Sequence, residues 1–315
     1  MPRPAWASIP AVTLVLMIGC TAPVGEPPPS GPGERPSPWP TASEAPERLI
    51  AIGDIHGDYE AMMQALYLAQ VVDDSWTWSG GTSWVVQTGD QLDRGDDERR
   101  ILDEILRISE EAWDAGGAFI ALNGNHEAMN VELDLRYVTD GGFEDFADLA
   151  PAVSDQDEEL LSYPEAQRGR VAAFRPGGPY AMVLAEQNIA VIVGDTVFVH
   201  GGINPAHAER GLERINDEVQ EWMRGEDDWP WIVNGEGPVW IRDYSDETGE
   251  EECADLEDAL AILGVRRMVV GHTVYGEINH ACDEQVWRVD VGMASYYGGD
   301  PSVLEIVGDT LSIID

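Results

Sequence analysis

The chain has 315 residues, 43% of them hydrophobic, and carries 18 basic against 59 acidic side chains for a net charge of −41. It holds enough apolar material for a sizeable core but is too short for three domains. So negative a chain repels phosphate backbones, which excludes nucleic acid as a partner. A solvated acidic surface explains the charge; selection for cationic partners and adaptation to salt are the alternatives.

The first twenty residues differ from the rest. A basic residue, Arg3, precedes an apolar run over residues 5–19 that ends at Cys20. The run is too short to span a bilayer with margin, and its order is that of an export signal. Residues 16–20, Leu-Met-Ile-Gly-Cys, resemble the lipobox of bacterial lipoproteins. We therefore expect a lipid on Cys20 that anchors the protein in the bacterial cell envelope, on the periplasmic or outer-membrane face; plain secretion and a retained apolar anchor are the alternatives.

Residues 21–46 are rich in proline and also contain glycine, serine and glutamate, without apolar periodicity. Such a composition cannot bury surface, so it predicts a disordered, semi-stiff linker. The sequence therefore predicts three parts: a signal peptide over 1–20, a linker over 21–46 and a catalytic domain over 47–315.

Five short apolar runs follow in the domain, and each leads directly into glycine or histidine and further polar residues. The runs are residues 49–52, 84–86, 118–122, 196–199 and 268–270. Their length and their apolar character on both faces predict buried strands, and segments 59–70 and 97–115 have helical spacing. Strands alternating with helices favour an α/β domain, in which polar groups gather at the carboxyl ends of the strands.

The polar clusters contain metal-binding side chains. Three oxygen ligands and three imidazoles stand at the predicted strand ends: Asp54, His56, Asp90, Asn125, His200 and His272. This mixed set without thiolates suits Mn, Fe or Zn rather than Ca and argues against a structural zinc site. Six ligands are too many for one catalytic ion, so two ions that share a carboxylate are predicted. Taken singly, each cluster is more simply a turn or a core residue, and His207 and His280 are assigned that simpler role.

In order, the clusters read Asp-x-His at 54–56, Gly-Asp-x-x-Asp-Arg-Gly at 89–95, Gly-Asn-His-Glu at 124–127, His-Gly-Gly at 200–202 and Gly-His-Thr at 271–273. This set resembles the calcineurin-like metallophosphoesterase superfamily, and its second and third motifs look like the phosphoprotein phosphatase branch. The resemblance spans residues 49–315. It implies an α/β fold in which a β-sandwich is flanked by α-helices on both outer faces, with the site at one edge of the sandwich.

Two features of the sequence indicate which members of this superfamily it resembles most. The last motif is Gly-His-Thr, as in bacterial-type relatives and diadenosine tetraphosphatases, instead of the Arg-Ala-His of common eukaryotic serine/threonine phosphatases. Residues 174–180 (Phe-Arg-Pro-Gly-Gly-Pro-Tyr) and 237–242 (Gly-Pro-Val-Trp-Ile-Arg) look like the Shewanella-like protein phosphatases, some of which prefer phosphotyrosine.

The resemblance implies how the ligands divide between two divalent ions. The first ion would be held by Asp54, His56 and Asp90, and the second by Asp90, Asn125, His200 and His272. Manganese is the expected metal, with iron or zinc as alternatives. A hydroxide between the ions would attack phosphorus.

The same resemblance implies roles for the other site residues. His126 would protonate the leaving oxygen, and Asp93 would fix the tautomer of His126. Arg94 and Arg242 would bind the phosphate oxygens through their planar guanidinium groups, together with Asn125.

The leading hypothesis is a metal-dependent phosphoprotein phosphatase that hydrolyses phosphate monoesters of serine, threonine or tyrosine. Its partner would be a phosphoprotein, and it would reach the membrane only through the lipid. A hydrolase of dinucleoside polyphosphates or other small phosphate esters is the alternative. A catalytically silent binding module is disfavoured because all six ligands, His126 and Asp93 are present.

Residues 143–180, between the third and fourth motifs, include a charged stretch at 155–167 with helical character. This insertion would either cap the site and select substrates or form a surface excursion without contact to it. Tyr296 and Tyr297 are weaker candidates for the wall of the cleft.

Once Cys20 is lipidated, Cys253 and Cys282 are the remaining cysteines. An exported protein meets an oxidising compartment, which favours a disulfide between them. Two unpaired thiols are the alternative.

Overall fold

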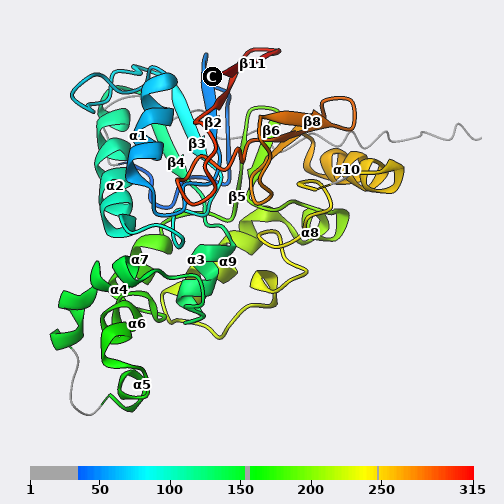
Figure 1. Cartoon of the computed structure of the whole chain (residues 1–315). Helices are drawn as coiled ribbons and strands as arrows, with labels where there is room; N and C mark the ends of the chain where they lie inside the picture. Colours follow the sequence, from blue (N-terminus) through cyan, green and yellow to red (C-terminus); the bar gives the residue numbers. More distant parts are fainter. Residues whose placement is uncertain (1–34, 153–156, 247) are drawn as a thin grey trace, which may run out of the picture.

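A computed structural model describes residues 35–152, 157–246 and 248–315. Two β-sheets form the centre of the molecule, and helices cover the outer face of each (Figure 1). The predicted β-sandwich flanked by helices is therefore confirmed. The lipobox with Cys20 and the first part of the predicted linker lie outside the described residues. Within the described part of the chain, no helix combines the length and apolar character that a membrane span requires.

One sheet has five strands in the order β11-β10-β2-β3-β4. These strands are β2 (Leu49–Ile52), β3 (Trp84–Gln87), β4 (Ala118–Ala121), β10 (Val303–Val307) and β11 (Thr310–Ile314). β2, β3 and β4 are parallel, since the crossover helices α1 (Tyr59–Leu68) and α2 (Glu98–Asp114) return the chain between them. The first three predicted strands and both predicted helices are confirmed, with bounds that differ by at most two residues at either end.

The other sheet has six strands in the order β1-β5-β6-β7-β9-β8. They are β1 (Ala42–Ser43), β5 (Ala190–Val193), β6 (Thr196–Val199), β7 (Arg267–Val270), β8 (Asn279–Ala281) and β9 (Val286–Arg288). β6, β7 and β9 are parallel, so their carboxyl ends lie at the same edge of the sheet. The fourth and fifth predicted strands are β6 and β7.

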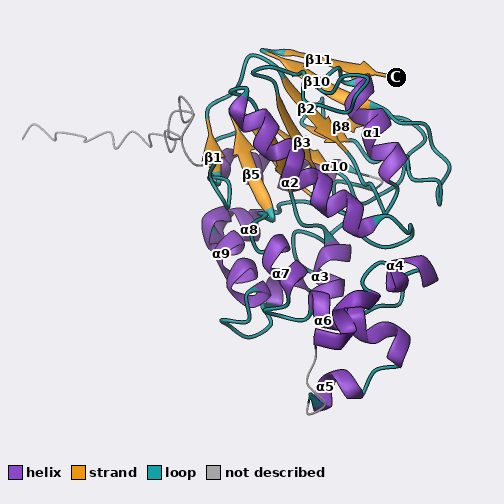
Figure 2. Ribbon diagram, turned by 90° about the vertical axis from the view of Figure 1, so that its left-hand side faces the viewer, coloured by secondary structure: helices purple, strands orange, loops and turns teal. Residues whose placement is uncertain are grey.

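Alternation along the strands divides the core into two parts. Phe198 of β6 and Val269 of β7 belong to the same buried cluster as the strands of the five-stranded sheet, so they face the interior of the sandwich. Their neighbours Val197 and Met268 point to the opposite face and pack with the second group of helices. That group includes α8 (Pro205–Arg210), α9 (Leu212–Met223) and α10 (Glu250–Leu263) (Figure 2).

The helices α3 (Asn125–Val131), α4 (Asp140–Glu144), α5 (Glu158–Leu161), α6 (Arg168–Phe174) and α7 (Pro179–Leu184) lie below the sheets in Figure 2. The chain also forms the 3₁₀ helices η1 (Ala147–Ala152), η2 (Glu165–Gln167) and η3 (Trp231–Val233). The expectation of one helical stretch over 155–167 is wrong. α5 ends at Leu161, and η2 begins after Pro164, whose missing N–H cannot continue a helix.

The folded unit begins before Glu47. Trp39 is only 7% exposed and packs edge-on against Trp84 and Trp113, with ring centroids 5.2 and 5.9 Å apart. β1 then pairs in parallel with β5. The predicted disordered linker is therefore wrong over its last residues, because the apolar area of one tryptophan outweighs the unfavourable composition around it.

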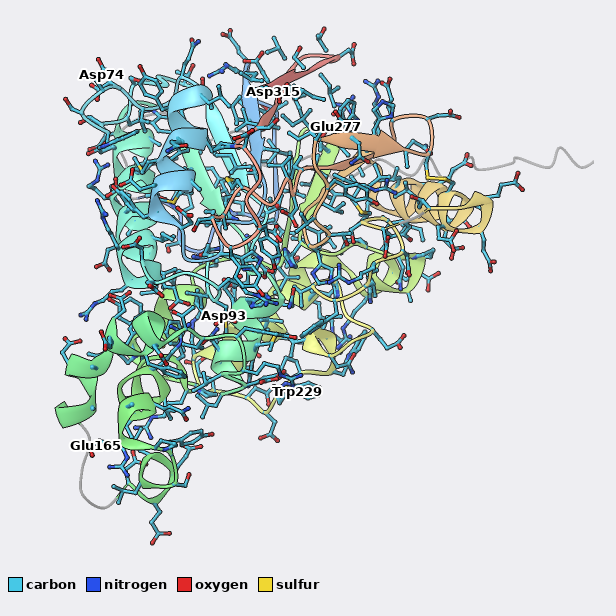
Figure 3. The ribbon with its side chains drawn as sticks, in the orientation of Figure 1. Asp74, Asp93, Glu165, Trp229, Glu277 and Asp315 are labelled. Carbon is cyan, nitrogen blue, oxygen red and sulfur yellow. A yellow bond between two sulfur atoms is a disulfide. The ribbon has the colours of Figure 1, made fainter. Side chains whose placement is uncertain are left out.

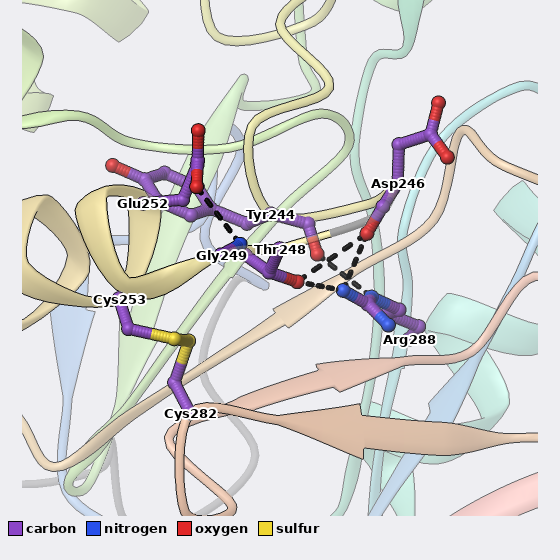
Figure 4. The surroundings of a disulfide bond; sticks show 8 residues. All are labelled: Tyr244, Asp246, Thr248, Gly249, Glu252, Cys253, Cys282 and Arg288. Carbon is purple, nitrogen blue, oxygen red and sulfur yellow. Dashed lines mark hydrogen bonds between the residues drawn. A yellow bond between two sulfur atoms is a disulfide. The ribbon is translucent and has the colours of Figure 1, made fainter.

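Cys253 at the start of α10 and Cys282 directly after β8 form a disulfide, as expected, with their Cα atoms 5.3 Å apart (Figure 4). Arg288 of β9 lies beside it and binds the backbone carbonyls of Tyr244 and Asp246. The bridge and Arg288 together hold the loop that follows Arg242 against the six-stranded sheet.

Candidate active site

The polar clusters meet at one edge of the sandwich because each follows the carboxyl end of a parallel strand. The loops after β2, β3 and β4 come from one sheet, and those after β6 and β7 come from the other. The structure brings together all six predicted ligands, each at most 7% exposed: Asp54, His56, Asp90, Asn125, His200 and His272. Asp93, in the loop after β3, lies between the sheets and the lower helices (Figure 3).

Each of the three imidazoles has one ring nitrogen against a backbone carbonyl. His56 Nδ1 lies 3.1 Å from Leu92 O, His200 Nδ1 3.0 Å from Thr88 O, and His272 Nε2 3.1 Å from Trp240 O. Because a carbonyl oxygen only accepts, these nitrogens carry the protons, and the other nitrogens keep lone pairs for a metal ion. Burial lowers the pKa of His56 to about 4, which favours the neutral form of that ring.

The free nitrogens face acceptors rather than donors. His200 Nε2 lies 3.0 Å from His272 Nδ1, 2.9 Å from Asn125 Oδ1 and 3.2 Å from Asp90 Oδ2. With the other ring nitrogens protonated, these are lone pairs directed at one another, an arrangement that is repulsive unless a cation lies among them. The donor set of imidazoles, carboxylates and an amide oxygen therefore fits divalent transition-metal ions.

The buried carboxylates of the site also indicate that it binds cations. Burial raises the pKa of Asp54 well above its usual range, and the neighbouring Asp290 and Asp90 raise it further. Asp290 is 1% exposed, and its Oδ2 has no hydrogen-bond partner among the described residues. Three carboxyl groups at such close quarters, away from water, require positive charge to remain ionised together.

Two overlapping groups of side chains come close enough to hold an ion. One contains His56, Asp90 and His126, and the other contains Asp90, His200 and His272. Asp90 belongs to both, which is the position of a shared ligand. The first group contains His126 where the resemblance implied Asp54.

His126 and Asp93 form a buried pair beside the ligand cluster. His126 Nδ1 lies 2.5 Å from Asp93 Oδ2, so His126 Nε2 is left to face the site, 3.8 Å from Asp90 Oδ2. Although burial opposes a charge on the ring, Asp90 and the bond to Asp93 raise the pKa of His126 above its ordinary value. The pair can therefore hold a proton at Nε2 more readily than a free imidazole can.

Arg94 lies between two aromatic rings at the rim. Its guanidinium carbon is 4.1 Å from the ring centroid of Tyr137 and 4.9 Å from that of Tyr296, and its terminal NH1 donates to the hydroxyl of Tyr296. The Nε of Arg94 is buried and has no hydrogen-bond partner among the described residues. Arg242, on the side of His272, donates to the carbonyl of His272. Both predicted phosphate-binding arginines thus border the ligand cluster.

The site also stores backbone strain. His56, Asp90, Asp93, Arg94 and His272 all have φ between 47° and 72°, a region that non-glycine residues seldom adopt. Such conformations cost about 1–3 kcal/mol each and persist where the surrounding structure imposes them.

Two motif glycines admit the acidic ligands. A Cβ on Gly124 would lie 2.2 Å from Asp90 Oδ1, and one on Gly271 would lie 2.3 Å from Asp54 Oδ1. Any side chain at either position would displace a carboxylate ligand.

Sequence reasoning missed several residues that hold this site. The Glu127 carboxylate accepts the backbone N–H groups of Asp90, Gln91, Leu92 and Gly124 at 2.6–3.1 Å. Its place in the Gly-Asn-His-Glu motif was a signal for such a role. Asp290 stands two residues after β9, close to a strand end like the other clusters, but Arg288 within that strand interrupts the apolar run that marked them.

The fold and this ligand set define the class of protein. The family model "Calcineurin-like phosphoesterase" matches residues 47–276, and the chain belongs to this family of metal-dependent phosphoesterases. Within it, the chain is 42% identical over 303 residues to Shewanella-like protein phosphatase 2 of Arabidopsis thaliana, covering 86% of this chain and 78% of that relative. The protein is therefore a metallophosphoesterase of the Shewanella-like phosphatase group.

Two further comparisons agree with this assignment. Shewanella-like protein phosphatase 1 of Plasmodium berghei is 25% identical, with 82% of this chain and 71% of that relative covered. A solved structure of a cold-active protein tyrosine phosphatase superposes with a TM-score of 0.72 and 25% identity, covering 87% of this chain and 78% of that one.

Proposed function

We propose that this protein is a metal-dependent phosphoprotein phosphatase with phosphotyrosine among its substrates. The observation that carries the proposal is the juxtaposition of the ligand cluster with the His126–Asp93 pair, whose side chains approach to 2.5 Å. The printed names of the relatives, protein phosphatases and a protein tyrosine phosphatase, support a protein substrate.

Two divalent ions, which we propose to be manganese, would be held by the six predicted ligands with Asp90 shared. Such ions supply a water molecule activated for attack on phosphorus and neutralise phosphate charge. The residues of the chain provide the proton for the leaving group and the contacts to the phosphate oxygens. Asp93 stabilises the positive charge of the protonated His126 ring; as the bond between phosphorus and the ester oxygen breaks, His126 Nε2 gives its proton to that oxygen and the ring becomes neutral. Arg94 and Arg242 bind the phosphate oxygens.

Tyrosine side chains at the rim support an aryl substrate. The Tyr297 ring lies 5.3 Å from that of His56, and Tyr137 lies 5.2 Å from His126, while Tyr296 is 58% exposed. Aromatic rings in this arrangement can pack against the phenyl group of phosphotyrosine at the mouth of the site.

A substrate panel tests this function. Phosphotyrosine, phosphoserine and phosphothreonine peptides and diadenosine tetraphosphate would be compared by kcat/KM in the presence of Mn²⁺. We expect the phosphotyrosine peptide to be hydrolysed fastest. A preference for diadenosine tetraphosphate would show that the protein is a hydrolase of dinucleoside polyphosphates instead of a protein phosphatase. No turnover of any phosphate ester would indicate a binding module.

We also propose that the protein is lipid-anchored in the bacterial envelope through Cys20. The motif lies outside the described residues, but the Cys253–Cys282 disulfide supports an oxidising compartment. Fractionation of the native host compares wild type with Cys20→Ser. We expect only the variant to leave the membrane fraction without detergent; wild-type protein that is soluble without detergent contradicts the anchor.

A further inference from the structure

Arg170 is a buried cation in the inserted helices, and in the sequence it lies outside every recognised motif. It lies on α6 and is 0% exposed. A guanidinium group removed from water is destabilising unless its charge and its donors are all matched. The partners of Arg170 therefore indicate what it does.

The partners of Arg170 surround the proposed acid pair. Nε donates to Asn130 Oδ1 at 2.8 Å, one terminal nitrogen donates to Glu98 Oε1 at 2.7 Å, and the other donates to Glu98 Oε2 and to the carbonyl of Gly142. The same nitrogen that binds Glu98 Oε1 lies 3.4 Å from Asp93 Oδ1. Glu98 is also 0% exposed, so this ion pair is wholly internal.

These contacts hold the backbone N–H and the Oδ1 of Asp93. The backbone N–H of Asp93 donates to Glu98 Oε1 at 2.5 Å, and the amide of Asn130 donates to Asp93 Oδ1 at 3.1 Å. The Asn130 amide also donates to the carbonyl of His126 at 2.9 Å. Asp93 Oδ1 is thereby occupied, and Oδ2 is left for the ring of His126.

Charge gives a second reason for the arrangement. Asp93 and Glu98 are adjacent carboxylates, both 0% exposed, and Arg170 is the cation that touches both. Without it the two acids would repel each other, and one would take up a proton or move. Either change weakens the support that His126 receives from Asp93.

We propose that Arg170 is a positioning residue for the general acid: through Glu98, Asn130 and Asp93 it sets the orientation of His126 toward the leaving oxygen. The inference rests on the proposed function of His126. In this proposal, the insertion over 143–180 supports the catalytic residues. The sequence had offered two other roles for it, a cap over the site or a surface excursion without contact to the site. The competing explanation is an ion pair that only anchors α6.

Leaving-group dependence separates these explanations. An alkoxide is a poor leaving group and needs a proton as the bond breaks, whereas p-nitrophenolate leaves readily without one. A defect in the general acid therefore slows alkyl phosphates strongly and p-nitrophenyl phosphate little. A defect in folding or in metal binding slows all phosphate esters alike.

The test compares Arg170→Gln, Arg170→Lys, Asn130→Ala and His126→Asn on a phosphoserine peptide, phenyl phosphate and p-nitrophenyl phosphate. For Arg170→Gln we expect kcat to fall roughly 100-fold on phosphoserine, less on phenyl phosphate and little on p-nitrophenyl phosphate, the same order as for His126→Asn. Arg170→Lys should lower kcat less than Arg170→Gln does, since lysine keeps the positive charge but lacks the planar guanidinium that binds Glu98 through two nitrogens. Asn130→Ala is a smaller change and serves as the second test in case Arg170→Gln does not fold. It should show the same order of losses on the three substrates.

A matched control is Arg267→Gln. Arg267 is 4% exposed on β7 and pairs with Asp195, away from the acid pair, so its loss should leave the order of the three substrates unchanged. Equal losses on all three substrates in the Arg170 and Asn130 variants would overturn the inference, as would a His126→Asn variant without leaving-group dependence. Wild-type protein inactive on every ester would instead refute the proposed function itself.

Discussion

The strand-end loops and the inserted helices serve one site in different ways. The loops supply the ligands, and each ligand stands within four residues of a short apolar strand. The insertion supplies Arg170, whose charge is matched by Glu98, 72 residues earlier in the chain. The candidate metal ligands are marked by local sequence pattern, whereas Arg170 is marked only by its burial and by partners that lie far away in the sequence.

The largest expected effect is at the residue shared by both ligand groups. Asp90→Asn removes the charge that two cations would share, so we expect loss of both metal ions and activity at the background of the assay. Metal analysis and turnover of p-nitrophenyl phosphate check this, with Asp74→Asn at the distant end of the molecule as the control (Figure 3). Wild-type metal content in Asp90→Asn would remove it from the ligand set.

His126→Asn distinguishes the two roles that proximity allows. As a general acid, His126 should leave metal content near wild type while turnover of a phosphopeptide falls roughly 10²–10⁴-fold. The comparison uses kcat and metal stoichiometry measured on the same preparation. Loss of one metal equivalent would instead make His126 a ligand, as the group with His56 and Asp90 suggests geometrically.

Glu127 is a motif residue that is not itself a predicted ligand. Its substitution tests whether such a residue affects metal binding, as the strand-end loops do, or only supports the structure around the site. Its carboxylate receives four backbone N–H groups, including that of Asp90, and burial raises its pKa to about 7. Glu127→Gln places amide hydrogens against those donors, so we expect metal affinity to fall roughly 10–100-fold. Titration of apo protein with Mn²⁺ measures this, and unchanged affinity would limit Glu127 to a structural role.

Arg94→Ala should weaken inhibition by inorganic phosphate about 10–100-fold, the scale of hydrogen bonds to charged groups, while the fold stays intact. The inhibition constant is measured by competition with p-nitrophenyl phosphate. Arg136→Ala is the matched control, since Arg136 also lies over the Tyr137 ring but pairs with Asp134. Equal phosphate inhibition in wild type and Arg94→Ala would remove Arg94 from the site.

The smallest effect on catalysis is expected at the disulfide. Replacing Cys253 and Cys282 by serine opens a loop with a sequence separation of 29, which should lower the free energy of unfolding by about 3–4 kcal/mol in the chain-entropy model. Thermal unfolding with and without reductant checks this, and kcat/KM below the transition should stay near wild type. An unchanged Tm would show that the bridge contributes nothing to stability.

The sequence predicted a large share of the fold because its decisive strands are short and buried on both faces. Leu49–Ile52 and Thr196–Val199 have the predicted bounds. The misses have a physical cause as well. A composition argument cannot weigh one buried tryptophan against many prolines, which is why Trp39 and β1 were assigned to a linker. Helical character at 155–167 was likewise interrupted at Pro164.

By itself, the sequence predicted the six candidate ligands, because metal chemistry restricts such positions to few residue types, and the family resemblance implied the roles of His126, Asp93 and the two arginines. Tertiary structure alone decided which ring nitrogen each histidine offers, since His56, His200 and His272 are oriented by carbonyls from other loops. It also decided that α6 delivers Arg170 to Asp93. A buried charge must find its counter-charge in space, and separation along the chain places almost no limit on where that partner lies.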